Sequence, residues 1–141
     1  MEKGQISIDL LITLIVAIIA VGAMGAIIAT YSEAQERSTI QQQLQYDALK
    51  TASLITASQA LSDTNFRIES RIGAIFYTDE NNNYHSAYPD MNIITNNKLN
   101  LSLTVKGQKQ DANAYFYADT LTTISTDSVK ATGTVVITNA Q

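Results

Sequence analysis

Residues 10 to 29 read LLITLIVAIIAVGAMGAIIA, and this run decides the fold of the first part of the chain. Every residue in it is apolar or small except Thr13, and no charged residue occurs between Asp9 and Glu33. An α-helix needs about 20 such residues to cross the hydrocarbon core of a bilayer. The run therefore predicts one apolar transmembrane helix, with Tyr31 just beyond it in the place of an interfacial anchor.

The composition predicts one small exported domain behind this helix. The chain has 141 residues, of which 45% are hydrophobic and 16% charged, and the part after residue 30 is rich in Thr, Ser, Asn and Gln. Lysine and arginine number 9 against 13 aspartates and glutamates, so clustered cations are lacking and nucleic acid is not expected as a partner. Because the sequence has no cysteine, neither disulfides nor thiolate metal sites are available. The domain must hold together by packing.

The residues before the apolar run, Met1 to Asp9, fit a conventional secretory signal poorly. Such a signal has a positive start, an apolar stretch of about 7–15 residues and a small-residue cleavage site. Here the charges cancel, the acidic Asp9 abuts the run, and the run is longer than that stretch. A plain signal anchor is the simpler alternative.

The segment Lys3-Gly4-Gln5-Ile6-Ser7-Ile8-Asp9-Leu10 resembles the class III signal of archaeal type IV pilins. In that family a short leader ends in glycine before a Gln-x-Ser-x-Glu-Phe-like start, and a membrane-embedded prepilin peptidase cuts after the glycine. The resemblance implies cleavage between Gly4 and Gln5, with the apolar helix retained on the mature protein. The sequence departs from the family pattern at Asp9, where glutamate is usual, and at Leu10, where phenylalanine is frequent. Short motifs need the right context, which here is the apolar run directly behind.

The resemblance also implies a function. The family's members are structural subunits of extracellular filaments, so the expected location is a cell-surface filament that the precursor reaches through the cytoplasmic membrane, with surface adhesion as its role. The expected partners are further copies of the chain, the prepilin peptidase and the pilus assembly machinery. Asp9 stands where the family has the glutamate that pairs with the N-terminal amine of a neighbouring subunit. The residues expected in the filament-core helix are Leu10, Leu11, Leu14, Ile15, Ile18 and Ile19.

Two other interpretations stay open. The chain could be a monomeric, single-span surface protein with a small β-domain for binding. It could also be a subunit of the archaellum, the related rotating filament, although the short ectodomain and the lack of a more basic leader flank argue against this.

Helical sequence continues beyond the apolar run. Residues 33–37 and 40–60 contain strong helix formers and neither glycine nor proline, which predicts a single helix from about Gln5 to Leu61. In its second half an apolar stripe recurs at spacings of three or four. The stripe is too short for a coiled coil, so we expect it to pack on the chain's own domain. Its members are Ile40, Leu44, Ala48, Ala52 and Ile55.

Two glycines interrupt the apolar run. Gly22 and Gly25 each cost about 1 kcal/mol relative to alanine in a helix. Two explanations are equally open: close helix packing, since small residues let backbones approach in lipid, and a locally softened helix.

After Asn65 the pattern changes from helical to alternating. Residues 98–106 place Leu99, Leu101, Leu103 and Val105 on one face and Asn100, Ser102 and Thr104 on the other, which is typical of a half-buried strand. Strands are also predicted at 112–118, 120–126 and 129–138, and at 74–78 and 84–88 around a hairpin turn at 79–83. The predicted fold class is α+β, with a long N-terminal helix followed by a small antiparallel β-sheet or sandwich head domain. The expected divisions are the leader 1–4, the filament-core helix 5–30, an amphipathic extension 31–62 and the head domain 66–141.

The sequence offers no pattern for catalysis, so no enzyme activity, catalytic residue, metal site or cofactor is predicted. His85 is the only histidine and is expected to be exposed. Residues 79–83 carry oxygen ligands but lack the spacing and the glycine of an EF-hand, which favours a solvated turn over a calcium site. In Tyr115-Phe116-Tyr117, alternation should send Phe116 to the core and both tyrosines to the surface.

The only Asn-x-Ser/Thr sequon begins at Asn100. Alternation along its strand points Asn100 away from the apolar face, so we expect room for a sugar there. Asn100 is therefore a candidate for N-glycosylation.

Overall fold

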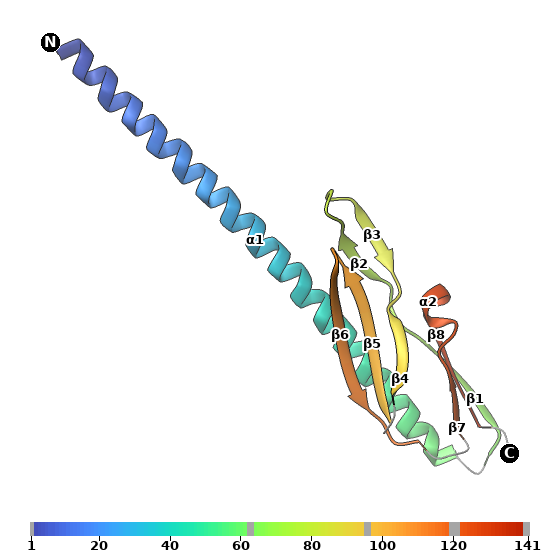
Figure 1. Cartoon of the computed structure of the whole chain (residues 1–141). Coiled ribbons are helices and arrows are strands. Elements are labelled where there is room, and N and C mark those ends of the chain that lie inside the picture. Colours follow the sequence, from blue (N-terminus) through green and yellow to red (C-terminus); the bar gives the residue numbers. More distant parts are fainter. Residues whose placement is uncertain (1, 62–63, 95–96, 119–121, 140–141) are drawn as a thin grey trace. The chain divides into compact units, whose positions relative to one another are not determined.

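The computed structural model describes residues 2–61, 64–94, 97–118 and 122–139, without the side chains of residues 2–7. The chain divides into two compact units, Met1–Glu36 and Arg37–Gln141. Helix α1 (Glu2–Ser58) begins in the first unit and ends in the second, where the short 3-10 helix η1 (Gln59–Leu61) follows it (Figure 1). The long helix predicted to run from about Gln5 to Leu61 is confirmed.

Within and just after the apolar run, threonine hydroxyl groups of α1 form hydrogen bonds with carbonyl groups of the same helix. The hydroxyl of Thr13 donates to the carbonyl of Asp9 at 2.8 Å, and the hydroxyl of Thr30 donates to the carbonyl of Ala26 at 3.0 Å. Such bonds to the preceding turn leave no hydroxyl unpaired in an apolar environment. The run can therefore stay helical in lipid or in a protein core.

The second unit contains the β-strands, which form three antiparallel sheets among the described residues. Their orders are β1-β8-β7, β2-β3 and β4-β5-β6 (Figure 1). The predicted α+β fold class, a long helix followed by small antiparallel sheets, is confirmed. The strands are β1 (Phe66–Arg71), β2 (Ile75–Thr78), β3 (Tyr84–Ala87), β4 (Asp90–Ile94), β5 (Lys98–Val105), β6 (Gln108–Tyr115), β7 (Thr122–Ser125) and β8 (Thr134–Asn139).

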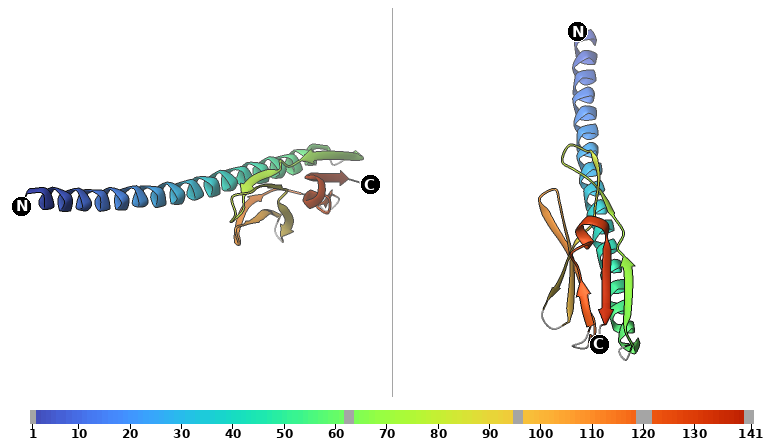
Figure 2. Two further views of the ribbon diagram at one scale, coloured as in Figure 1. Left: turned by 90° about the horizontal axis from the view of Figure 1, so that it is seen from above. Right: turned by 90° about the vertical axis from the view of Figure 1, so that its right-hand side faces the viewer.

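The predicted apolar stripe forms one wall of the core of the second unit. Figure 2 shows the last turns of α1 lying alongside the strands. Each member of the stripe, from Ile40 to Ile55, is buried in one core cluster that also contains the apolar face of β5 and Val135 and Ile137 of β8. Burying a Leu or Ile side chain contributes about 1.5–3 kcal/mol, so the helix stabilises a β-domain that has no disulfide. The expectation that the stripe packs on the chain's own domain is confirmed.

Two predicted strands have different bounds in the structure. Strand β6 begins at Gln108, because Lys106 and Gly107, with φ of 50° and 70°, make a tight turn where a longer one was expected. The segment predicted as a strand from 129 to 138 starts instead as a short helix, α2 (Val129–Thr132). Strands β1 and β4 were not predicted, although residues 66–69 alternate in polarity.

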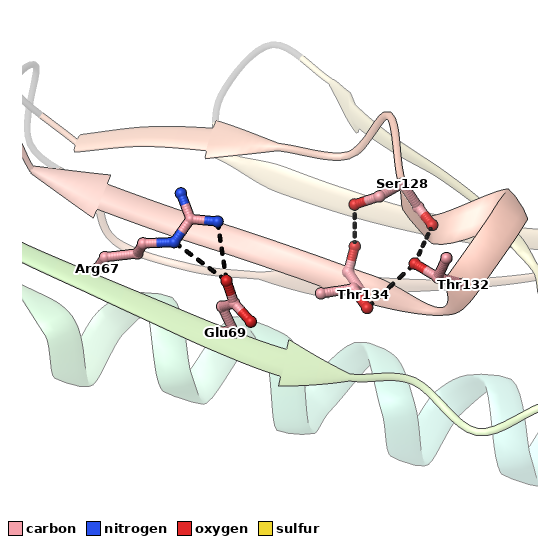
Figure 3. Close-up of polar contacts among 5 residues, drawn as sticks. All are labelled: Arg67, Glu69, Ser128, Thr132 and Thr134. Carbon is pink, nitrogen blue, oxygen red and sulfur yellow. Dashed lines mark hydrogen bonds and ion pairs between the residues drawn. The ribbon is translucent and has the colours of Figure 1, made fainter.

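Helix α2 ends where only glycine fits. Gly133 has φ of 68° and donates its N–H to the carbonyl of Val129 at 2.7 Å, closing the helix in the left-handed conformation. A Cβ at this position would lie 2.5 Å from Cε1 of Tyr88. Hydroxyl groups brace the turn: Thr132 donates to the Ser128 carbonyl at 2.9 Å, and Ser128 donates to the Thr134 carbonyl at 2.8 Å (Figure 3).

Candidate functional site

The residues expected in the filament core lie on a surface that the first unit leaves uncovered. Every described side chain from Ile8 to Gln35 is exposed. Helix α1 is long and apolar enough to cross a membrane by length and composition. A helix that is apolar all round must be covered by lipid or by protein. The six predicted core residues range in exposure from 48% for Ile15 to 69% for Leu10, the others being Leu11, Leu14, Ile18 and Ile19.

The two helix glycines have open surroundings. A Cβ added at Gly22 or at Gly25 would meet no atom within 4 Å, apart from the backbone of the helix itself. The helix is continuous through both positions. Close packing at these glycines and local softening of the helix both stay predictions.

The residues of the predicted leader and pairing site lie at the start of α1. Gly4 and Gln5 are within the helix, but their side chains fall outside the described residues. Asp9 is exposed, and among the described side chains no cation pairs with its carboxylate. Cleavage after Gly4 and pairing of Asp9 stay predictions, and the pairing would have to use a cation outside this part of the chain.

The hairpin β2-β3 carries the only histidine of the sequence and the acidic turn beside it. Asp79 accepts hydrogen bonds from the main-chain N–H groups of Asn81 and Asn83, each at 2.8 Å, and lies 3.1 Å from Nε2 of His85. The bonds from Asn83, reinforced by those from His85 and Asn81, hold the pKa of Asp79 well below its usual range. The His85 ring also stacks on Tyr77 with centroids 5.8 Å apart.

This arrangement supports the prediction of a solvated turn. His85 is exposed, as expected, and the Asp79 carboxylate is occupied by donors from its own turn. The described residues include no group of three or more His, Cys, Asp or Glu side chains placed to hold a metal ion. The turn is held by hydrogen bonds among its own residues.

The expectation that Asn100 lies open to solvent, with room for a sugar, is wrong. The residue is 8% exposed, and its side-chain amide donates to Oδ1 of Asn113 at 2.9 Å. Strand β5 is the middle strand of its sheet, so Asn100 lies between Asn92 of β4 and Asn113 of β6. Alternation assigned Asn100 to the correct face but could not show that flanking strands cover it. The folded head domain therefore lacks the room for a sugar on which the glycosylation prediction depended.

The aromatic triplet follows its prediction. Phe116 is buried in the core, and Tyr115 and Tyr117 are exposed. The tyrosines therefore remain surface residues of the head domain.

One buried carboxyl group was missed from the sequence. Asp47 lies in α1 with 5% of its surface exposed. It comes three residues after Leu44 and directly before Ala48, and this helical spacing was the available signal that it faces inward.

Comparison of the chain with protein-family models, with curated proteins and with solved structures finds no match. The functional argument therefore depends on the motif at the N-terminus and on the structure itself.

Proposed function

We propose that this chain is a type IV pilin-like subunit, a structural protein that polymerises into an extracellular filament. The precursor enters the cytoplasmic membrane, a prepilin peptidase cuts it after Gly4, and the pilus assembly machinery moves it from the bilayer into the filament. The observation that carries the proposal is the helix from Ile8 to Gln35, exposed on every side and apolar from Leu10 to Ala29, directly behind the leader-like segment.

A filament accounts for the exposure of this helix. Lipid covers an apolar helix in the membrane, but water does not. If many copies bring their helices together, each helix leaves the bilayer for a protein core of similar polarity. Burial of each large aliphatic side chain then contributes about 1.5–3 kcal/mol relative to its exposure in water. The apolar helix is then shielded from water both before and after it leaves the membrane.

The continuity of α1 supports a filament over a simple anchor. One helix supplies both the exposed apolar run and the buried stripe from Ile40 to Ile55. A single-span anchor requires only about 20 apolar residues and can be joined to its domain by a loop. Here α1 is helical from Glu2 to Ser58, without a linker.

The head domain takes the outer position in the proposed filament. Its core is closed by α1 and the three sheets, and its surface carries hydroxyl, amide and charged side chains, such as the exposed Arg67–Glu69 ion pair at 2.8 Å (Figure 3). An exposed pair of this kind contributes little to stability, and it suits a surface in water. The heads would form the sheath, which is the part of the filament that meets other surfaces in adhesion.

Shearing of cells followed by fractionation tests the proposal. An epitope-tagged chain should appear in the sheared, pelletable surface fraction as the processed form. A Gly4→Leu variant, whose leader cannot be cut, should stay in the membrane fraction. Retention of both proteins in the membrane would favour a monomeric surface anchor.

A further inference from the structure

Asp47 is a buried acidic residue at the contact between α1 and the connection from β1 to β2. Its carboxylate lies beside Gly73 in that connection, where a Cβ built at the glycine would be 4.0 Å from Oδ2. This oxygen has no hydrogen-bond partner in the described part of the chain. A buried carboxylate with an unpaired oxygen is costly when it is ionised, because neither water nor a donor compensates its charge.

The neighbouring residues hold the same connection to the helix. The Gln43 side chain donates to the carbonyl of Ala74 at 3.3 Å, and the Lys50 ammonium donates to the carbonyl of Arg71 at 3.4 Å. Asp47 lies between these two contacts on α1. A change in its charge therefore acts on a segment that is tied to the helix on both sides.

The charged groups around Asp47 compensate its negative charge only in part. Lys50 on α1 favours the ionised form, but Lys50 is exposed and its ammonium is bonded to the Arg71 carbonyl. Arg71, at the end of β1, is also exposed. Burial of Asp47 raises the pKa of its carboxyl, and the opposing effects of Lys50 and of the Gly73 N–H are smaller.

We propose that Asp47 makes the contact between α1 and the β1–β2 connection responsive to pH, because its ionised carboxylate places an uncompensated charge in that contact and its protonated form does not. Protonation removes the uncompensated charge from the contact. The head domain then has a built-in response to the acidity of its surroundings. This inference concerns the fold of the single chain and does not depend on filament formation.

The direction of the effect follows from proton linkage. The folded chain binds a proton at Asp47 up to a higher pH than the unfolded chain does, because the folded pKa is raised. The stability that this proton contributes is fully present below the unfolded pKa, about 3.9, and is lost as the pH rises through the folded pKa. The contribution of Asp47 to the stability of the head domain should therefore fall as the pH rises above about 3.9.

The test is thermal unfolding of the full chain in detergent micelles, followed by near-ultraviolet circular dichroism of its tyrosines between pH 4 and pH 7.5. The Tm of the wild type should fall as the pH rises. Asp47→Asn, which keeps the shape but cannot ionise, should have a Tm several degrees higher at pH 7 and a flatter pH profile. Asp127→Asn is the control, since Asp127 is an exposed aspartate of the same unit, and it should follow the wild type.

Two results would overturn the proposal. If Asp47→Asn kept the pH profile of the wild type, or lowered the Tm equally at every pH, Asp47 would be a structural hydrogen-bond acceptor only. Because the variant could fail to fold, the native chain is also titrated by NMR at the Asp47 carboxyl carbon. A midpoint above the ordinary value for aspartate, about 3.9, is expected, and a midpoint at or below that value would reject the proposal.

Discussion

The side-chain amide of Gln41 donates a 2.7 Å hydrogen bond to the main-chain carbonyl of Asp111 and so joins α1 to the edge strand β6. Gln45 makes the next contact, to the carbonyl of Asn113 at 3.5 Å. Four helical residues advance about 6 Å and two strand residues about 6–7 Å, so successive glutamines meet successive carbonyls. The helix thereby covers a sheet edge that could otherwise pair with another chain.

Removal of the first contact should destabilise the head domain modestly. Gln41→Ala leaves the Asp111 carbonyl to water, and we expect a loss of about 1 kcal/mol in the free energy of unfolding. The measurement is urea unfolding of the full chain in micelles. Gln42→Ala is the matched control, since Gln42 is exposed on the same helix. Equal losses in the two variants would show that the Gln41 contact contributes nothing specific.

Asp79 should affect stability with the pH dependence opposite to that of Asp47. Its pKa is lowered in the folded hairpin, so its contribution is present above the unfolded pKa, about 3.9, and is lost as the pH falls through the folded pKa. Asp79→Asn should therefore make the amides of Asn81 and Asn83 exchange faster at neutral pH, and the difference from wild type should shrink in strong acid. Amide hydrogen exchange, expressed as protection factors, measures this. If the difference in protection factors between Asp79→Asn and wild type did not change with pH, the effect would come from the shape of the side chain and not from its charge.

The fold was largely predictable because its main signals are periodic. The apolar run and the stripe from Ile40 to Ile55 predict α1, and strict alternation predicts β5. Coverage by neighbouring strands is not periodic, and for this reason the burial of Asn100 was missed. The left-handed Gly133, which ends α2 and lets β8 begin, is also a tertiary feature, because its environment depends on Tyr88.

The residues of the candidate site could be selected from a sequence motif, but their contacts could not be predicted from it. Gly4, Gln5 and Asp9 can be selected from their order before an apolar run. The proposed contacts of Asp9 and of the glycines Gly22 and Gly25 would involve other copies, and a single chain contains no such contact. Asp47 was overlooked because a charged residue beside an apolar stripe is most often solvated.

Processing should leave a mature N-terminus at Gln5. Intact-mass and N-terminal peptide analysis of the native protein should find the chain without residues 1–4, with Gln5 cyclised or methylated in a fraction of molecules. An uncut leader, or a cut beyond Ala26, would remove the main support for the pilin-like assignment.

Asp9→Asn should separate membrane insertion from assembly. A carboxylate within the membrane costs about 2.5–3.5 kcal/mol at a helix centre on insertion scales, so an acidic residue at the edge of the run needs a function. We expect Asp9 to pair with the cationic Gln5 amine of a neighbour, setting the register of the subunits more than adding stability. The variant should insert and be cut normally but give few filaments. Thr13→Val is the control, because the Thr13 hydroxyl bonds to the Asp9 carbonyl of its own helix. Normal filament yield from Asp9→Asn would reject the pairing, and loss of insertion would favour a role in topology.

Electron microscopy of sheared cell-surface material tests the central claim most directly. Cells that carry the tagged chain should release filaments that bind tag-specific gold along their whole length, because every subunit contributes one copy. Cells in which the tagged chain reaches the membrane and the surface, but whose sheared material contains no labelled filaments, would contradict the account.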